Sequence, residues 1–367
     1  MSEIRFEDVT KIFGRSVEAV KDLSFIIEDG EYVSLIGPSG CGKTTTLRLL
    51  AGTILPTKGQ IFFNDQPMEN VRIQDRNIGF VFQHFAIFPH MTVRENIAYG
   101  PTVRGRSRKE IEHLVETALK SVQIGDKAEL YPDSLSAPDW QKTALARVLA
   151  SEAEVLLLDE PLGALDQKIR EEFQLFLRDL VKKEKLTAIH VTHDQAEALT
   201  ISDRVAVMNK GKLIQLGTPA DLIYHPNHLF TSFFVGESDF LEGVVIDDTK
   251  KEAKVRIGQS IIKVKNMGVE KGKRVAVAVR REFFQVEQIS TKDLSNSLPG
   301  IVIEDQFLGL LRRVRIKLEN QQIIEAKIHA KHPINFKENE KVRVNIEPSI
   351  TRCFDYPKEG IASALEM

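Results

Sequence analysis

Residues 37–44 read Gly-Pro-Ser-Gly-Cys-Gly-Lys-Thr and match the pattern G-x-x-x-x-G-K-[ST]. The apolar run at residues 31–37 predicts a buried strand before this segment, and residues 44–51 predict a helix after it. Glycines in such a loop let successive backbone N–H groups turn towards an anion at the positive end of the helix. Lys43 can then reach β- and γ-phosphates, and the hydroxyl of Thr44 can hold Mg²⁺. We therefore expect an α/β fold built around a phosphate-binding loop.

Two carboxylates follow a second apolar run. Residues 155–161 read Val-Leu-Leu-Leu-Asp-Glu-Pro, so Asp159 and Glu160 come directly after the run. A buried parallel strand delivers charge to its carboxyl end in this way. We expect Asp159 to face the Mg²⁺ and Glu160 to polarise a water that attacks the γ-phosphate. Gln83 and His193 also follow apolar, β-branched runs, which places them at strand ends.

The order of these segments resembles that of the ATP-binding cassette (ABC) ATPases, and the resemblance covers about the first 235 residues. It is close to ABC importer subunits in three segments, residues 37–48, 88–97 and 192–198. The resemblance implies a P-loop (RecA-like) ABC ATPase core with an antiparallel β flap and a helical subdomain. It also implies that the chain binds and hydrolyses ATP with Mg²⁺.

The resemblance gives individual residues their expected roles. Phe13 matches the aromatic position that stacks on adenine, with a place in the core as the alternative. Gln83 matches the residue that reaches the metal and the attacking water, and His193 matches the switch histidine on the γ-phosphate. Asp166 matches the loop that crosses to the other subunit's site. The expected catalytic residues are Glu160, His193 and Gln83; the expected nucleotide contacts are Phe13, Gly37, Ser39, Gly40, Cys41, Gly42, Lys43, Thr44, Thr45, Ser136, Asp159 and Asp166; the expected Mg²⁺ ligands are Thr44, Gln83 and Asp159.

One family motif is altered. Residues 135–142 read Leu-Ser-Ala-Pro-Asp-Trp-Gln-Lys where L-S-G-G-Q-x-Q-R is expected, a motif that closes over the γ-phosphate held by the opposite subunit. Pro138 has no N–H to donate, and Ala137 adds a Cβ where glycine allows close approach. Asp139 brings a negative charge towards a polyanion. Each change is expected to weaken closure.

Ser136 leaves two alternatives open. Its hydroxyl could still contact the phosphate, or Ser-x-x-Asp could cap its own helix. A homodimer with two altered motifs is the favoured assembly, and the alternative pairs this chain with a second ATPase subunit whose intact motif completes the site. In a further alternative the chain is a catalytically impaired, regulatory subunit.

Composition limits the remaining possibilities. The 367 residues suffice for two domains, and 42% hydrophobic residues suit a globular protein. The net charge of -2 gives no overall field that would favour nucleic acid, so no nucleic-acid partner is expected. The two cysteines imply no disulfide framework and favour a reducing cytoplasm. Because no apolar run is long enough to span a bilayer and the N-terminus lacks a signal-peptide core, we expect a peripheral subunit on the cytoplasmic side of the cell membrane.

The domain organisation follows from a change in pattern after residue 235. Residues 1–235 are expected to form the nucleotide-binding domain, with the helical subdomain at about residues 85–150. This subdomain and the loop of Gln83 are the expected contacts with membrane permease subunits. Residues 236–367 contain short alternating runs and predict a small β-barrel (OB-like) domain for regulation or dimerisation. No structural metal is assigned to its histidines.

The expected function is that of an ATP-hydrolysing subunit that energises a membrane importer, a translocase, for a small polar solute such as an inorganic anion, ferric ion or polyamine. An extracytoplasmic solute-binding protein is an expected partner. A soluble, non-transport ABC ATPase of the chromosome-structure or repair type is less favoured. Such proteins carry a long coiled-coil insertion, and the segment between Gln83 and the altered motif has no sustained heptads.

Overall fold

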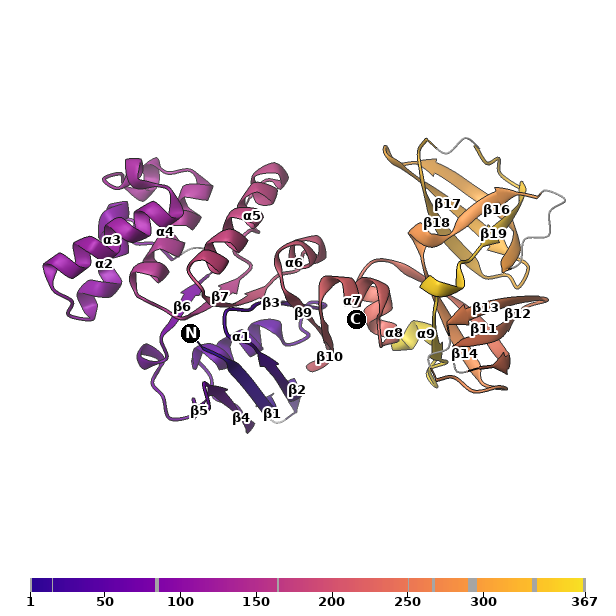
Figure 1. Ribbon diagram of the computed structural model, residues 1–367, viewed down its shortest axis with the longest axis horizontal. Coiled ribbons are helices and arrows are strands. Elements are labelled where there is room, and N and C mark those ends of the chain that lie inside the picture. The colour runs from indigo at the N-terminus through magenta and orange to yellow at the C-terminus, as the bar shows by residue number, and fades with distance from the viewer. Residues whose placement is uncertain are drawn as a thin grey trace. The chain divides into compact units, whose positions relative to one another are not determined.

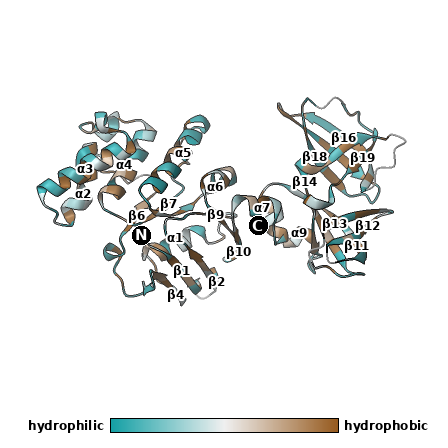
Figure 2. Cartoon of the chain, viewed as in Figure 1, coloured by the Kyte–Doolittle hydropathy of each residue, from teal (hydrophilic) through white to brown (hydrophobic). Residues whose placement is uncertain are grey.

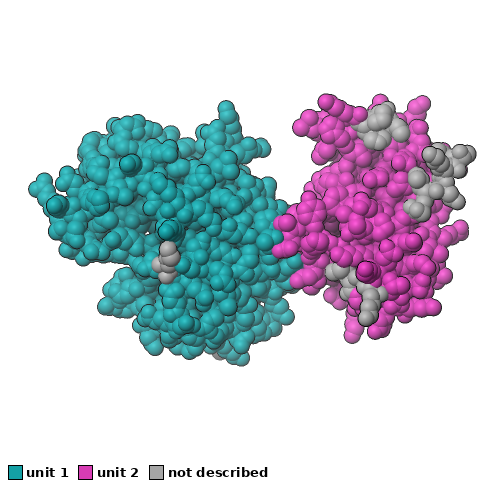
Figure 3. Space-filling view, in the orientation of Figure 1, with its two compact units in different colours: residues 1–219, 367 teal, residues 220–366 magenta. Residues whose placement is uncertain are grey.

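The computed structural model describes residues 2–14, 16–82, 86–163, 165–249, 251–265, 268–289, 296–331 and 335–365. They form two compact units, residues 1–219 and residues 220–366, which Figure 3 distinguishes by colour. We expected the boundary between residues 235 and 236, whereas the two units divide between residues 219 and 220. Two short helices, α7 (Pro219–Tyr224) and α8 (Leu229–Phe234), lie in the segment between these positions. Each unit is described by itself below.

A six-stranded sheet forms the centre of the first unit, in the order β10-β9-β3-β8-β7-β6. Its strands are β3 (Tyr32–Ile36), β6 (Ile78–Val81), β7 (Val155–Asp159), β8 (Thr187–Val191), β9 (Arg204–Asn209) and β10 (Lys212–Gly217). All neighbours are parallel except β10, which is antiparallel to β9. Parallel strands place their carboxyl ends at one edge of the sheet, so the segments that follow β3, β7 and β8 meet there. The expected α/β class is confirmed.

The central sheet lies between two hydrophobic cores. In β7, Val155 and Leu157 belong to one core, and Leu156 and Leu158 belong to the other. This alternation follows from the two-residue period of a strand, and it explains why the whole run is apolar although it lies in one strand. All four side chains are at most 1% exposed. The sheet is therefore rigidly held on both faces up to the point where Asp159 begins the functional edge.

An antiparallel flap covers one of these cores. It has the order β2-β1-β4-β5, with β1 (Ile4–Phe13), β2 (Val17–Ile27), β4 (Lys58–Phe63) and β5 (Gln66–Pro67). Helix α1 (Lys43–Ala51) contributes Leu47, Leu49 and Leu50 to the same core. The expected β flap is confirmed, and it fixes α1 against the sheet.

The other core is covered by helices. Figure 1 shows α2 (Val93–Val103), α3 (Arg108–Val122) and α4 (Ala137–Ala150) grouped at one end of the unit, where the helical subdomain was expected. Capping boxes start all three, Thr92 with Glu95 in α2, Ser107 with Glu110 in α3 and Ser136 with Asp139 in α4. The remaining helices of this unit are α5 (Gln167–Lys183) and α6 (Gln195–Ile201), with short 3₁₀ turns at Ile73–Asp75, Gly125–Lys127 and Pro132–Ser134.

The second unit is built mainly from strands, as expected for a C-terminal β domain. Two five-stranded antiparallel sheets have the orders β13-β12-β11-β14-β20 and β15-β19-β16-β17-β18. The first contains β11 (Ser238–Asp248), β12 (Glu252–Ile257), β13 (Ser260–Lys265), β14 (Arg274–Arg280) and β20 (Arg352–Asp355). The second contains β15 (Gln285–Gln288), β16 (Ser297–Phe307), β17 (Leu311–Leu318), β18 (Ile323–His329) and β19 (Lys341–Asn345). Short helical segments are at Arg281–Phe283, Pro348–Ile350 and α9 (Ile361–Ala364).

Strand alternation forms the core of this second unit. In β17, Val314 and Ile316 are fully buried, whereas Arg315 between them is partly exposed. Figure 2 shows the resulting mixture of hydrophobic and hydrophilic colour along its strands. Across the described residues of both units, no helix has the length and apolar character needed to cross a membrane.

Candidate active site

The loop between β3 and α1 has a shape that only glycine allows at two positions. Gly42 has φ +108°, and a Cβ there would lie 2.4 Å from the carbonyl oxygen of Ala19. A Cβ on Gly37 would lie 2.2 Å from the carbonyl oxygen of Met208. Contacts this short do not occur between real side chains and backbone, so the loop can close this tightly only with glycine. The backbone is thereby free to approach a phosphate group.

Lys43 points back into this loop. Its Nζ donates to the carbonyl oxygens of Gly37, at 2.7 Å, and Pro38, at 3.0 Å, and the residue is 4% exposed. The first turn of α1 contains no acidic residue, and no side chain caps Gly42. Because the N-terminal N–H groups and the ammonium carry positive charge at the same place, the loop is suited to a polyanion. This cradle fits a nucleotide phosphate.

The other loop residues divide into backbone and side-chain candidates. Cys41 is 3% exposed and belongs to the hydrophobic core beneath the flap, and burial raises the pKa of its thiol against the opposing charge of Lys43. Only its backbone can face a ligand. Thr44 and Thr45 are partly exposed in the first turn of α1, whereas Ser39 and Gly40 are exposed at the loop tip. Their nucleotide contacts stay predictions.

A carboxylate and an imidazole meet at the carboxyl ends of β7 and β8. The Nε2 atom of His193 lies 2.7 Å from Oε1 of Glu160, and the side chains are 50% and 25% exposed. Glu160 has φ +49°, and its backbone N–H donates to the carbonyl oxygen of Val191 at 2.9 Å. The left-handed backbone and this hydrogen bond aim the carboxylate towards the turn after β8. The two expected catalytic residues are thus within hydrogen-bond distance.

Asp159 connects this pair with the phosphate-binding loop. Burial raises the pKa of its carboxyl group, and the neighbouring Glu160 raises it further. Arg48, His193 and Lys43 oppose that rise through their positive charge. Since these groups act on one carboxyl, the end of β7 faces the start of α1, as expected for the C-terminal edge of a parallel sheet. Thr44 and Asp159 therefore lie on elements that could share one Mg²⁺.

Three further expected residues have different surroundings. Phe13 is 42% exposed, with Nζ of Lys11 lying 5.3 Å from its ring centroid, so it is not part of the core. Adenine stacking by Phe13 stays a prediction. Asp166 caps α5 by accepting the N–H of Ile169 at 3.1 Å. Gln83 lies outside the described residues.

In the altered motif at residues 135–139, Ser136 and Asp139 are hydrogen-bonded to each other. The N–H of Ser136 donates to Oδ2 of Asp139 at 3.3 Å, and the Ser136 hydroxyl donates to the same oxygen at 2.5 Å. Nζ of Lys127 lies 2.7 Å from that oxygen, and the Asp139 side chain is only 10% exposed. The negative charge of Asp139 is thus neutralised within the subunit, which corrects the expectation that it points towards a polyanion. The Ser136 hydroxyl bonds a residue of its own helix in this structure, and its contact with a phosphate stays a prediction.

Two contacts here were not found by sequence reasoning. Lys127 is distant in sequence from Asp139, and no pattern in the chain pairs them. Gln141 Nε2 donates to the carbonyl oxygen of Pro161 at 2.6 Å, which ties α4 to the segment directly after Glu160. Both depend on the packing of α4 against its neighbours, and a local motif carries no signal for that.

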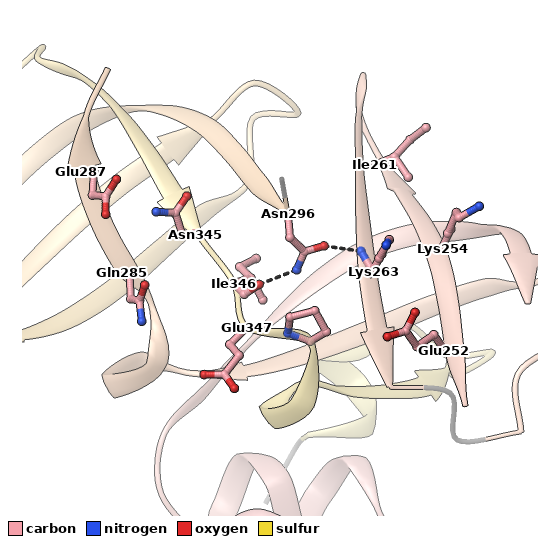
Figure 4. Close-up of a pocket in the computed structure, with 11 residues that line it drawn as sticks. Glu252, Lys254, Ile261, Lys263, Gln285, Glu287, Asn296, Asn345, Ile346 and Glu347 are labelled. Atoms are coloured by element: carbon pink, nitrogen blue, oxygen red, sulfur yellow. Dashed lines mark hydrogen bonds between the residues drawn. The ribbon is translucent and has the colours of Figure 1, made fainter. Parts of the chain in front are cut away.

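A cavity of about 780 Å³ lies in the second unit (Figure 4). Asn296 bridges its two sides, because its Oδ1 accepts the N–H of Lys263 and its Nδ2 donates to the carbonyl oxygen of Ile346. The lining carries charges of both signs, from Glu252, Lys254, Lys263, Glu287 and Glu347. This mixture favours no one class of ligand.

Comparisons with known proteins agree on one family. The profile of the family described as ABC transporter matches residues 20–163. The spermidine/putrescine import ATP-binding protein PotA of Haemophilus ducreyi is 39% identical, over 86% of either chain. The sulfate/thiosulfate import ATP-binding protein CysA 1 of Agrobacterium fabrum is 40% identical, over 87% of this chain and 89% of its own. The ATP-binding cassette MJ0796, solved as a dimer in a post-hydrolysis state with ADP and Pi, has a TM-score of 0.52 and 29% identity, over 59% of this chain and 98% of its own.

Proposed function

The chain belongs to the ABC transporter family, as an ATPase of the importer type, and we propose that residues Lys43, Glu160 and His193 carry out its ATP hydrolysis. The observation that carries the proposal is the 2.7 Å contact between His193 and Glu160 beside the glycine-rich loop. Both side chains are partly exposed, so a ligand can reach them. The relatives over most of the chain are ATP-binding import subunits, which supports hydrolysis coupled to uptake.

We propose the following division of labour at the site. The loop N–H groups and Lys43 bind the phosphates, since Lys43 can exchange the carbonyl oxygens of Gly37 and Pro38 for phosphate oxygens. Thr44 and Asp159 would hold Mg²⁺, which supplies charge neutralisation on the β- and γ-phosphates when bound. Glu160 accepts a proton from the attacking water, and His193 holds the Glu160 carboxylate in place.

For the assembly we propose a homodimer that works with membrane permease subunits on the cytoplasmic side of the membrane. The dimer of MJ0796 supports this arrangement. A heterodimer with a second ATPase subunit stays the alternative, because Ala137, Pro138 and Asp139 replace the residues of the usual closing motif. In that case the partner's motif would complete the site of this chain.

The first test is the steady-state ATPase activity of the full-length chain. Glu160→Gln should lose at least about a hundredfold in kcat, as expected for removal of a general base, while ATP binding is kept. Glu154→Gln is a matched control, because Glu154 precedes the opposite end of β7 and bonds Ser2 and Asn77 instead. If Glu160→Gln retained the wild-type rate, the assignment of Glu160 would be wrong.

A second variant separates the two assemblies. Restoring the motif with Ala137→Gly, Pro138→Gly and Asp139→Gln should change little if the homodimer is active as it stands. If the wild type hydrolyses no ATP and the restored chain does, the heterodimer or regulatory alternative is favoured instead.

For the solute, we propose a small polar solute such as an inorganic anion, ferric ion or polyamine. The named relatives import spermidine and putrescine or sulfate and thiosulfate, which supports this class without separating its members. Recognition is expected to reside in the permease and an extracytoplasmic solute-binding protein. Uptake of labelled spermidine, sulfate and ferric ion by the native host, with and without the chain, tests the proposal, and loss of none of these uptakes would contradict it.

A further inference from the structure

The turn that carries His193 is fastened to one residue of α6. The hydroxyl of Thr192 donates to Oε2 of Glu197 at 2.7 Å and accepts the N–H of Asp194 at 3.0 Å. Asp194 in turn accepts the N–H of Glu197 through its Oδ1 at 3.1 Å. Thr192, which precedes His193, is therefore bonded to the side chain of Glu197. Asp194, which follows His193, is bonded to the backbone N–H of Glu197.

Glu197 lies beside two further buried polar side chains, those of His190 and Tyr32. Its Oε1 lies 3.4 Å from Nε2 of His190, and Nδ1 of His190 lies 3.1 Å from the hydroxyl of Tyr32. Tyr32 and His190 are fully buried, and Glu197 is 4% exposed. Burial lowers the pKa of His190 to about 3, so its ring is neutral at physiological pH. Neither Oε1 of Glu197 nor Nε2 of His190 has a hydrogen bond to another described residue.

A carboxyl group at this place is expensive to bury. Removing a carboxyl group from water costs free energy unless it is bonded, and an apolar side chain of similar volume would fill the site without that cost. What a carboxyl adds is the directional hydrogen bond to Thr192, which an apolar side chain cannot make. The geometry therefore favours a role in orienting the turn rather than in packing.

We propose that Glu197 is a positioning residue for ATP hydrolysis, which holds the turn at residues 192–194 so that His193 meets Glu160. This inference rests on the proposed role of the Glu160–His193 pair. The Glu197 side chain acts through the hydroxyl of Thr192, which also accepts the N–H of Asp194. Loss of its hydrogen bond frees the turn and lets the His193 imidazole move away from the carboxylate of Glu160.

The protonation state of Glu197 depends on groups from all the elements around it. Burial raises the pKa of Glu197 to about 7; the Thr192 hydrogen bond opposes the rise, Asp194 adds to it, Arg170 opposes it and Glu160 adds to it. The groups that face Glu197 are Tyr32 from β3, His190 and Thr192 from the β8 segment, Asp194 on its own turn, Glu160 after β7, and Arg170 from α5. Glu197 therefore changes its charge near neutral pH, and its effect on His193 should change with it.

The test compares three variants of the full-length chain. Glu197→Leu and Thr192→Val each remove the hydrogen bond to the turn, whereas Glu197→Gln keeps an acceptor for Thr192 and offers an N–H to His190. Glu31→Gln is the control, because Glu31 is also a buried carboxylate but lies before the opposite end of β3, paired with Arg204. The readouts are the imidazole NMR signals of ¹⁵N-histidine protein, with His193 assigned from His193→Gln, and kcat and KM for ATP.

The expected result separates positioning from folding. Glu197→Leu and Thr192→Val should both shift or split the His193 signal and lower kcat about tenfold or more at nearly constant KM. The double variant should lose no more kcat than Thr192→Val alone, since Thr192→Val already removes the hydrogen bond to Glu197 together with the one from the N–H of Asp194. Glu197→Gln should keep the wild-type His193 signal and most of kcat. Its pH profile of kcat between pH 6 and 8 should be flatter than that of the wild type. Glu31→Gln should leave the His193 signal unchanged.

Two results would overturn the proposal. One is an unchanged His193 signal in folded Thr192→Val, which deletes the hydrogen bond to Glu197 together with the one from the N–H of Asp194. The other is a loss of kcat in Glu31→Gln as large as in Glu197→Leu, which would show a general effect of stability. If the wild-type chain hydrolyses no ATP, the proposed function fails, but the NMR comparison still decides whether Glu197 positions His193.

Discussion

The ion pair between Lys127 and Asp139 gives a prediction that reports on the altered motif. Lys127→Met removes the ammonium but keeps most of the aliphatic side chain, so Asp139, which is 10% exposed, keeps its hydrogen bond with the side chain of Ser136. Burial raises the pKa of Asp139, but hydrogen bonds from Lys127 and Ser136 outweigh burial and leave that pKa lowered. The variant should therefore destabilise the start of α4.

The size of this effect can be bounded from the geometry. At the 2.7 Å distance between Lys127 Nζ and Asp139 Oδ2, Coulomb attraction with an effective dielectric constant of about 20 has a ceiling of about 6 kcal/mol. The Lys127 side chain is 34% exposed, so solvent screening and the cost of fixing a long side chain remove most of that. The positive end of α4 also stabilises Asp139 without Lys127. We expect a coupling free energy of about 1–2 kcal/mol.

The assay uses a probe at the site. The chain contains one tryptophan, Trp140, which follows Asp139 and donates its Nε1–H to the carbonyl oxygen of Pro132 at 2.9 Å. Urea unfolding followed by Trp140 fluorescence therefore reports on this segment in a double-mutant cycle of Lys127→Met and Asp139→Asn.

The pH dependence gives an internal check on that cycle. Because the folded-state pKa of Asp139 is lowered, the stabilisation is present above the unfolded pKa and is lost as pH falls through the folded value. The coupling should therefore disappear on acidification and shrink in 1 M salt. A coupling below about 0.3 kcal/mol at pH 7 and low salt would refute the reasoning, because it would place the pair among ineffective surface contacts.

Three further predictions concern the active site. Gly42→Ala should abolish ATP binding, measured with a fluorescent nucleotide, because its Cβ would lie 2.4 Å from the carbonyl oxygen of Ala19; wild-type affinity in a folded variant would contradict this. Glu160→Gln with ATP and Mg²⁺ should accumulate a closed dimer in light scattering or size exclusion, and a monomer under all conditions would count against the homodimer. Glu197 has a folded-state pKa near 7 against an ordinary value of 4.5, so its neutral form is favoured by folding and wild-type stability should fall as pH rises from about 4.5 to 7. Relative to Glu197→Gln, that loss should reach up to about 3 kcal/mol in urea unfolding, and parallel pH profiles of the two proteins would show that Glu197 does not titrate in this range.

Local patterns in the sequence were sufficient for the fold class and for the residues placed at strand ends. The glycine-rich loop, the apolar run before Asp159 and the run before His193 each predict a buried strand that ends in a functional group. Because parallel strands share one carboxyl edge, these three patterns already imply that the groups approach one another. The 2.7 Å contact between Glu160 and His193 is the outcome of that rule.

The state of the altered motif was open to sequence reasoning only in part. Ser-x-x-Asp predicts a helix cap, and the structure has Ser136 bonded to Asp139. The sequence could not say which way the Asp139 charge points, because that depends on Lys127, which a separate 3₁₀ turn brings to 2.7 Å. A sequence gives the charged residues but not their partners. The packing of neighbouring elements decides which charges meet.

The sequence by itself determined a phosphate-binding loop, the strand ends that carry Asp159, Glu160 and His193, and a separate β domain. These features depend on local periodicity and on the backbone freedom of glycine, which are properties of short segments. The tertiary structure alone decided the partner of Asp139 and the hydrogen bond that joins the His193 turn to the buried Glu197. Those contacts join residues on different elements inside a low-dielectric interior, where burial and distance set both charge state and orientation, and neither quantity is encoded by local sequence.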